Sequence, residues 1–259
     1  MTFSERQARR AAARRRIPWS LAMLTVCALG AYPLAPEDLR PTLTFATVGT
    51  FFATSFVHAW AARGPTWALT FVALAVPGAF VVEVVGLHTG MPLGRYSYSD
   101  TLGAQALGVP VVMPFAWAMM AYPALLIGRL LVRREVALVA GFALAVWDVF
   151  LEPQMVAAGQ RTWQDPGSAL PGVPDVPWTS FAGWLVAATL LMAVLHKVLP
   201  RRAARDGDGV PAVLYLWTYL SSVLANLVLL GRPGLALVGG LAMGCVVVPY
   251  VYKLWEREW

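Results

Sequence analysis

The chain has 259 residues, of which 58% are hydrophobic and only 13% charged, and its mean hydropathy is +0.62. A soluble domain would carry about 25% charged residues, so this composition excludes a soluble core and predicts an all-α polytopic membrane protein. The net charge is +6. Because the basic residues fall at the ends of apolar runs, where they orient a chain in a membrane, the charge does not indicate nucleic-acid binding.

Eight apolar runs are predicted to cross the membrane, since about 20 residues span its hydrocarbon core. The fourth run holds Pro110, Pro114 and Pro123, and we expect a kink there. The fifth run is short and could be a partial or broken helix. The spans are expected at residues 17–35, 41–62, 67–87, 108–131, 135–151, 178–199, 211–231 and 234–253.

Residues 1–16 are predicted to form a basic cytoplasmic tail, and residues 17–259 one transmembrane domain with outer-side loops at 88–107 and 152–177. Of the 20 Lys and Arg residues, sixteen fall on the side of the tail and four on the other side. This bias predicts that both termini lie in the cytoplasm, with the protein in the cell membrane. The Arg-rich start is also compatible with a signal peptide, but no clean cleavage site follows it, so an uncleaved first helix is favoured.

Acidic residues interrupt two of the apolar runs, near the ends predicted to face outward. Ionisable groups at such depth are costly and are therefore functional candidates. Asp148 and Glu152 are four residues apart and share a helix face. Close carboxylates in a medium of low dielectric constant cannot all ionise easily, so one is expected to stay protonated near neutral pH. The predicted catalytic residues are Glu83, His88, Asp100, Asp148 and Glu152.

The third and fourth spans resemble the fifth and sixth at offsets of 65 to 69 residues. Glu83 matches Asp148 or Glu152, and Trp117 matches Trp184; Arg95 similarly matches Arg161. Chance is a real alternative in so biased a composition. A true repeat would be parallel, about an axis along the membrane normal, and would set the two acidic clusters facing each other across one cavity.

Aromatic and polar residues flank these acids. Tyr96, Trp147 and Trp178 are candidates to face a cation, although aromatic residues also gather at membrane interfaces. Arg95 is either a partner for a buried acid or a plain loop charge, and Gln154 is expected to support the site. His88 either relays a proton or is an interfacial residue. His58 and His196 are predicted to be interfacial, which leaves no metal cluster with ligand spacing.

Four segments resemble a known family: EVVGLHTGMPLGRYSYSD at 83–100, GVPVVMPFAWAMMAYP at 108–123, WDVFLEPQMVAAG at 147–159 and VPWTSFAGWL at 176–185. They are similar to the CruF-type carotenoid hydratases, the membrane carotenoid biosynthesis proteins of bacteria and haloarchaea. The resemblance is strongest over roughly 80–190. It implies addition of water to the terminal double bond of an acyclic carotenoid end, giving a 1'-hydroxy carotenoid, without a cofactor.

Hydration of such an alkene begins with protonation at the less substituted carbon and continues with capture of a tertiary carbocation by water. We expect Asp148 to be the acid, and Glu83, helped by His88, to hold the water and take its proton; these roles could be exchanged. Asp100, Arg95 and Gln154 would support them. The expected partners are a carotenoid in the bilayer, water and membrane lipid, with other enzymes of carotenoid synthesis as candidates and no nucleic acid.

Two other functions remain open at the level of sequence. A carotenoid cyclase of the lycopene type would form the same cation and quench it with a neighbouring double bond in a dry site. A carotenoid-binding or transport protein would catalyse nothing. Transport sites usually lie near the middle of the bilayer, whereas these acids lie towards one face.

Overall fold

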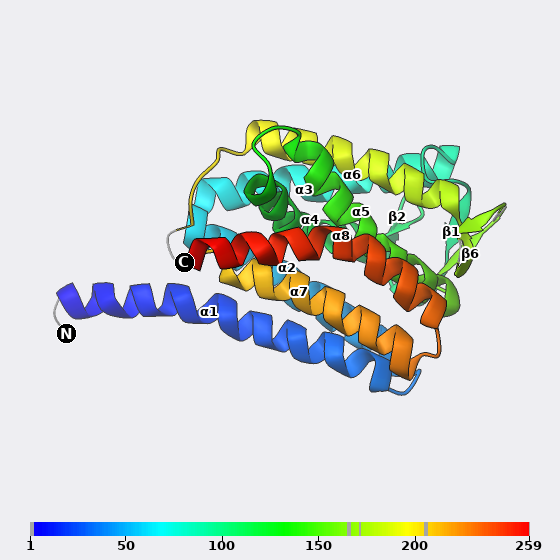
Figure 1. Cartoon of the computed structure of the whole chain (residues 1–259), viewed down its shortest axis with the longest axis horizontal. Coiled ribbons are helices and arrows are strands. Elements are labelled where there is room, and N and C mark those ends of the chain that lie inside the picture. The colour runs from blue at the N-terminus through cyan, green and yellow to red at the C-terminus, as the bar shows by residue number, and fades with distance from the viewer. Residues whose placement is uncertain (1–2, 165–166, 171, 205–206, 259) are drawn as a thin grey trace.

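A computed structural model describes residues 3–164, 167–170, 172–204 and 207–258. Within these residues, eight long helices run roughly side by side (Figure 1). Short 3₁₀ helices follow α1 (η1, Tyr32–Leu34) and precede α4 (η2, Asp100–Leu102), and a π-helical turn (η3, Ala225–Leu229) extends α7. The long helices are α1 (Phe3–Ala31), α2 (Arg40–Arg63), α3 (Pro65–Thr89), α4 (Val112–Leu131), α5 (Val136–Ala157), α6 (Trp178–Val198), α7 (Gly209–Leu224) and α8 (Pro233–Glu258).

The predicted all-α polytopic class is confirmed. In the described parts of the chain, seven helical segments are long and apolar enough to cross a membrane. The segment missing from this set is α2, which is 24 residues long but carries five threonines and an arginine at each end. These polar residues lower the mean hydropathy of α2 without shortening the helix, so α2 is still long enough to run beside the other helices.

The fifth span differs from the expected short helix. It was expected to end at residue 151, whereas α5 is an unbroken helix of 22 residues that continues to Ala157. Glu152 and Gln154 are therefore helical and do not lie in the following loop. Pro153 removes one backbone hydrogen bond from the helix but does not end it.

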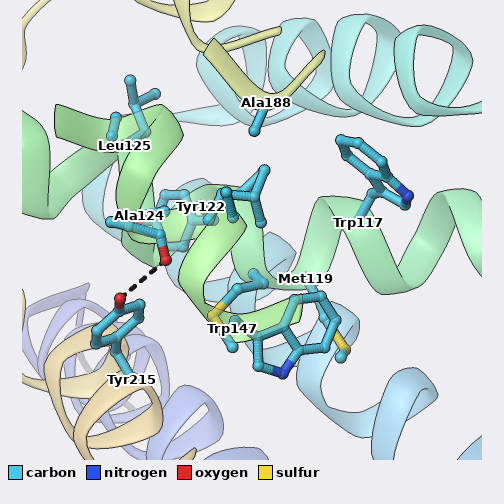
Figure 2. Packing of buried hydrophobic residues seen from close by; sticks show 14 of the residues in the cluster. Trp117, Met119, Tyr122, Ala124, Leu125, Trp147, Ala188 and Tyr215 are labelled. Atoms are coloured by element: carbon cyan, nitrogen blue, oxygen red, sulfur yellow. Dashed lines mark hydrogen bonds between the residues drawn. The ribbon is translucent and has the colours of Figure 1, made fainter. Parts of the chain in front are cut away.

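The centre of the bundle is made by α4 and α5. In their apolar segments 78% and 67% of the residues are buried, against 17% in α1. Trp117, Met119 and Trp147 lie among the packed side chains there (Figure 2). Tyr215 of α7 donates a hydrogen bond of 2.8 Å to the carbonyl of Ala143 and so ties α7 to α5.

Small residues allow the central helices to approach closely. A Cβ added to Gly141 of α5 would lie 2.5 Å from Oγ1 and 2.6 Å from Cα of Thr189 in α6. Packing through small residues is typical of helices inside membranes, where backbones must approach closely to gain contacts.

The outer face of α6 is apolar, as expected of a surface in contact with lipid. Its exposed residues recur every four positions, at Val186, Leu190, Val194 and Val198.

Both termini lie at one end of the bundle, and short strands lie at the other end (Figure 1). β1 (Tyr96–Tyr98) pairs antiparallel with β4 (Arg161–Trp163), with Ser97 opposite Thr162. This pairing joins the loop between α3 and α4 to the loop between α5 and α6. Two further antiparallel pairs lie within these loops: β2 (Gln105–Ala106) with β3 (Val109–Pro110), and β5 (Ala169–Leu170) with β6 (Val173–Pro177).

Candidate functional site

Three charged side chains from different elements meet in the interior at the strand end of the bundle. They are Glu83 of α3, Glu152 of α5 and Arg161 of β4, which we call the buried ion-pair cluster; their exposed fractions are 0%, 1% and 1%. Arg161 Nη1 lies 2.5 Å from Glu152 Oε2, and its Nη2 lies 3.5 Å from Glu83 Oε2. The β1–β4 pairing places the arginine between the two helices.

Every carboxylate oxygen in this cluster has a donor from the protein. Glu83 Oε2 accepts hydrogen bonds of 2.8 Å from the hydroxyls of Tyr96 and Tyr98, and its Oε1 accepts one of 2.9 Å from the indole N–H of Trp117. Glu152 Oε1 accepts one of 3.0 Å from Trp163. This geometry leaves Glu83 no oxygen without a protein donor, so it does not support the predicted role of Glu83 in holding a water.

The guanidinium of Arg161 is also enclosed by aromatic rings. Its central carbon lies 4.4 Å from the ring centre of Tyr96 and 4.6 Å from that of Tyr98, and Nη2 also donates to the Tyr98 hydroxyl. Burial opposes the charge of Arg161, but neighbouring Glu152 and Glu83 hold its pKa well above the usual value. Burial likewise raises the pKa of both tyrosines. The arginine is therefore a cation and the tyrosines are neutral donors.

Asp148 lies one turn before Glu152 on α5 and differs from the other two acids. It is only 2% exposed, and its Oδ1 has no hydrogen-bond partner in the part of the chain that the structure describes. Glu152, Arg161 and Glu83 lie close enough to interact electrostatically with the Asp148 carboxyl. Leaving a buried polar atom unsatisfied costs about 1–3 kcal/mol, so this carboxyl is retained at an energetic cost and remains available to a ligand.

A second polar atom near the centre is also unpaired within the described residues, the indole N–H of Trp184 on α6. Its ring stacks on that of Trp117, with ring centres 4.0 Å apart and planes 13° from parallel. Trp117 and Trp184 are counterparts in the predicted repeat, and the β1–β4 pair joins the loops of the two predicted units. Contacts between counterparts are expected where an axis relating two units passes between them, but the repeat itself stays a prediction.

The face of α5 that points away from Glu152 lines a pocket. This pocket is also bounded by α2 and α7, and we call it the α2–α5–α7 pocket. It encloses about 810 Å³, including its open mouth, and its walls include Trp147 and Gln154. Because successive helix residues are about 100° apart, Asp148 lies about 100° from Trp147 and about 60° from Leu151, which also lines the pocket. Asp148 therefore lies at the boundary between the pocket and the ion-pair cluster.

Several predicted site residues lie outside both places. His88 is exposed, and its Nε2 lies 3.1 Å from the carbonyl of Leu107. Since five helix residues turn the side chains of His88 and Glu83 about 140° apart, this geometry does not support the expectation that His88 assists Glu83. Asp100, Arg95 and Trp178 are exposed in the loops or at the start of α6.

The opposite end of the bundle has its own polar cluster. His58, predicted to be interfacial, is only 6% exposed, and its Nδ1 lies 2.8 Å from the Tyr122 hydroxyl. Arg63 donates to the same hydroxyl and pairs with Asp208 at 2.6 Å. These contacts fix the loop between α6 and α7. No group of three residues able to hold a metal ion occurs among the described residues.

The site residue that sequence reasoning missed is Arg161. It entered the sequence analysis only as the repeat counterpart of Arg95. A signal was present, because Arg161 is one of only four basic residues predicted on the side where the buried acids lie. A cation close to buried acids in an apolar chain is expected to pair with them.

A family model described as "Carotenoid biosynthesis protein" matches residues 43–248. The chain belongs to the carotenoid biosynthesis protein family. The matched region contains the ion-pair cluster, Asp148 and every helix that lines the α2–α5–α7 pocket except α1 and η1. The predicted resemblance is thereby confirmed at the level of the family.

The chain is also similar to the bisanhydrobacterioruberin hydratase of Haloarcula japonica, with 29% identity over 172 residues. The match covers 61% of this chain and 57% of that relative, so the chain spans less than two thirds of the relative's length. No solved structure matches the chain.

Proposed function

We propose that this member of the carotenoid biosynthesis protein family is a hydratase that adds water to the terminal double bond of an acyclic carotenoid end. The observation that carries the proposal is Asp148, a buried carboxyl with an unpaired oxygen beside an aromatic-lined pocket. Family membership and the named activity of the Haloarcula japonica relative support it. The product is a tertiary alcohol, a 1'-hydroxy carotenoid.

The reaction needs one proton donor, a wall that tolerates a cation, and a water. Asp148 gives its proton to the less substituted alkene carbon, which leaves a tertiary carbocation. Trp147 and Phe150 line the pocket, and aromatic faces attract cations. Water bonds to the cation, and the Asp148 carboxylate takes the released proton back, so the enzyme ends each cycle unchanged and needs no cofactor.

In this proposal the buried ion-pair cluster positions the site and does not react. Arg161 connects α3 and α5 through Glu83 and Glu152, and the strand pair closes that end of the bundle. Closure keeps bulk water away from the carbocation, while electrostatic preorganisation lowers the barrier to its formation. This assigns Glu83 a positioning role in place of the predicted role as base.

The location proposed for the protein is the cell membrane, with both termini in the cytoplasm and the site towards the outer face. The bias of Lys and Arg towards the N-terminal side supports this orientation. The termini lie together at one end and the strand-bearing loops lie at the other (Figure 1).

A carotenoid cyclase is the second candidate, because it would use the same acid and the same cation. The pocket walls carry polar side chains, among them Thr47, Ser222 and Asn226. Such walls suit a water better than the dry surroundings that a cyclase needs. Product mass decides between them, since hydration adds one water per reacting end and cyclisation leaves the mass unchanged.

The test is expression in a host that makes an acyclic carotenoid, followed by mass analysis of the pigments. The wild-type chain is expected to yield carotenoid that has gained one water. Asp148→Asn keeps the shape of the side chain but cannot donate the proton, so the rate should fall by about 10²–10⁴-fold. Glu37→Gln is the matched control, because it makes the same change at a side chain that is 92% exposed. Wild-type yield from Asp148→Asn at equal protein level would contradict the role of Asp148.

A further inference from the structure

A buried hydroxyl in the wall of the α2–α5–α7 pocket lacks a hydrogen-bond partner within the described parts of the chain. Thr44, Thr50 and Thr54 on α2 each donate to a carbonyl four residues earlier, at 3.0, 2.7 and 2.7 Å. Thr47 lies on the same helix and is only 7% exposed, yet its Oγ1 has no hydrogen-bond partner among the residues described. Since Thr47 lines the pocket, this hydroxyl is free to bind a group that enters it.

The wall opposite is shaped by an irregular turn. α7 changes to a π-helical turn at Ala225, and Asn226 within that turn donates a hydrogen bond of 2.9 Å to the carbonyl of Ser222. Both Ser222 and Asn226 line the pocket.

Most of the remaining lining residues are apolar or aromatic, with Phe51 from α2, Met119 from α4, and Trp147 and Phe150 from α5. Trp147 and Met119 can be followed in Figure 2. The pocket is partly open to the surface, and exposed Leu227 and Val228 lie between Asn226 and Leu230, which line it. In a membrane protein such a surface faces lipid, so an apolar molecule dissolved in the bilayer can reach the pocket without crossing water.

We propose that the α2–α5–α7 pocket binds the end of an acyclic isoprenoid polyene, and that the Thr47 hydroxyl holds the oxygen that the reaction adds. This inference rests on the proposed hydratase function and deepens it. Trp147 and Phe150 contact the polyene end, and Asp148 approaches it from the edge of the same face of α5. Thr47 approaches from α2, so proton and water reach the alkene from different helices. Thr47 is thus a water-positioning residue.

The first test measures binding without turnover. Lycopene, an acyclic polyene, is titrated into Asp148→Asn protein in lipid nanodiscs, and the circular dichroism induced in the polyene band reports the bound fraction. Adding Ser222→Trp fills the pocket and should weaken binding at least tenfold. Adding Leu220→Trp places the same ring two residues away on the exposed side of α7 and should change binding less than twofold. Equal binding in both proteins would overturn the pocket assignment. The same result is expected if a membrane lipid, and not the polyene, occupies the pocket.

The second test separates binding from water delivery and does not depend on a large substitution. Thr47→Val keeps the shape of the side chain and removes the hydroxyl, whereas Thr47→Ser keeps the hydroxyl. We expect Thr47→Val to bind lycopene as wild type does but to lower kcat at least tenfold with KM little changed, and Thr47→Ser to restore kcat to within about threefold. A wild-type kcat in Thr47→Val would overturn the role of its hydroxyl.

The two proposals fail in different ways. If wild-type protein binds lycopene through the pocket but adds no water to any acyclic carotenoid end, the hydratase function is wrong and the pocket stands. If Ser222→Trp hydrates carotenoid at the wild-type rate, the function stands and the pocket assignment is wrong.

Discussion

Arg161 is the residue on which the buried ion-pair cluster depends. It is the cation that pairs with both Glu83 and Glu152, and it is almost completely buried. Removing one partner from a buried pair is costly because it leaves the other charges uncompensated, whereas loss of an exposed ion pair costs little.

Arg161→Gln is therefore expected to lower the free energy of unfolding by about 3–5 kcal/mol. The midpoint of thermal unfolding, measured on detergent-solubilised protein, should fall accordingly. Arg95→Gln is the matched control, because Arg95 is an exposed arginine in the partner loop and immediately precedes β1. Equal midpoints for the two variants would show that the cluster does not hold α3 and α5 together.

Sequence reasoning selected four acids for a sound physical reason, and the structure brings Glu83, Asp148 and Glu152 to one region of the interior while Asp100 is exposed in a loop. The sequence could not show which of their carboxylate oxygens accept hydrogen bonds. Two of the acids are saturated by donors and one is not. That difference depends on Tyr96 and Trp163, which the β1–β4 pairing brings together from different loops. The catalytic role of each acid stays a prediction.

At the scale of elements, the spans were predictable because length and hydropathy alone define them. The strands were not, since segments of two to five residues carry too little periodicity to be recognised. The end of α5 was missed because Glu152, Pro153 and Gln154 look like the start of a loop. Packing of the last turn of α5 against the rest of the bundle keeps these residues helical.

The close contact between α5 and α6 leads to a prediction at this scale. Gly141→Ala places a methyl group against the backbone of Thr189, which cannot move without shifting α6. Overpacking of this kind typically costs about 1–3 kcal/mol, and the midpoint of thermal unfolding should fall. Gly49→Ala is the control, because a Cβ there meets nothing within 4 Å in another helix. It should be neutral or slightly stabilising, since alanine favours a helix over glycine; a similar loss in both variants would contradict the packing argument.

At the scale of the whole molecule, the even number of long helices in the described residues is consistent with the two termini lying at one end (Figure 1). The positive-inside bias predicts that this end is cytoplasmic. The proposed site lies at the opposite end, where the loops of the two predicted repeat units pair. Which membrane face each end meets can be measured directly.

Cysteine labelling of intact cells supplies that measurement. Cys27 and Cys245 are first replaced by alanine, because both are exposed and free. Asp100→Cys should then react with a membrane-impermeant maleimide added outside the cells, and Arg201→Cys should react only after the cells are broken. Labelling of Arg201→Cys but not of Asp100→Cys in intact cells would reverse the proposed orientation and place the site towards the cytoplasm.

The pairing of Glu83 with Arg161 also constrains the order of events while the chain is being made. The two residues are 78 positions apart, and a ribosome adds about 5–20 residues per second, so roughly 4–16 s separate their synthesis. During that interval α3 carries a carboxylate into the membrane before its cation exists. Tyr96 and Tyr98 are made within 15 residues of Glu83 and are the first partners available to it. The nascent chain thus has hydrogen-bond donors ready for this acid well before the ion pair can form.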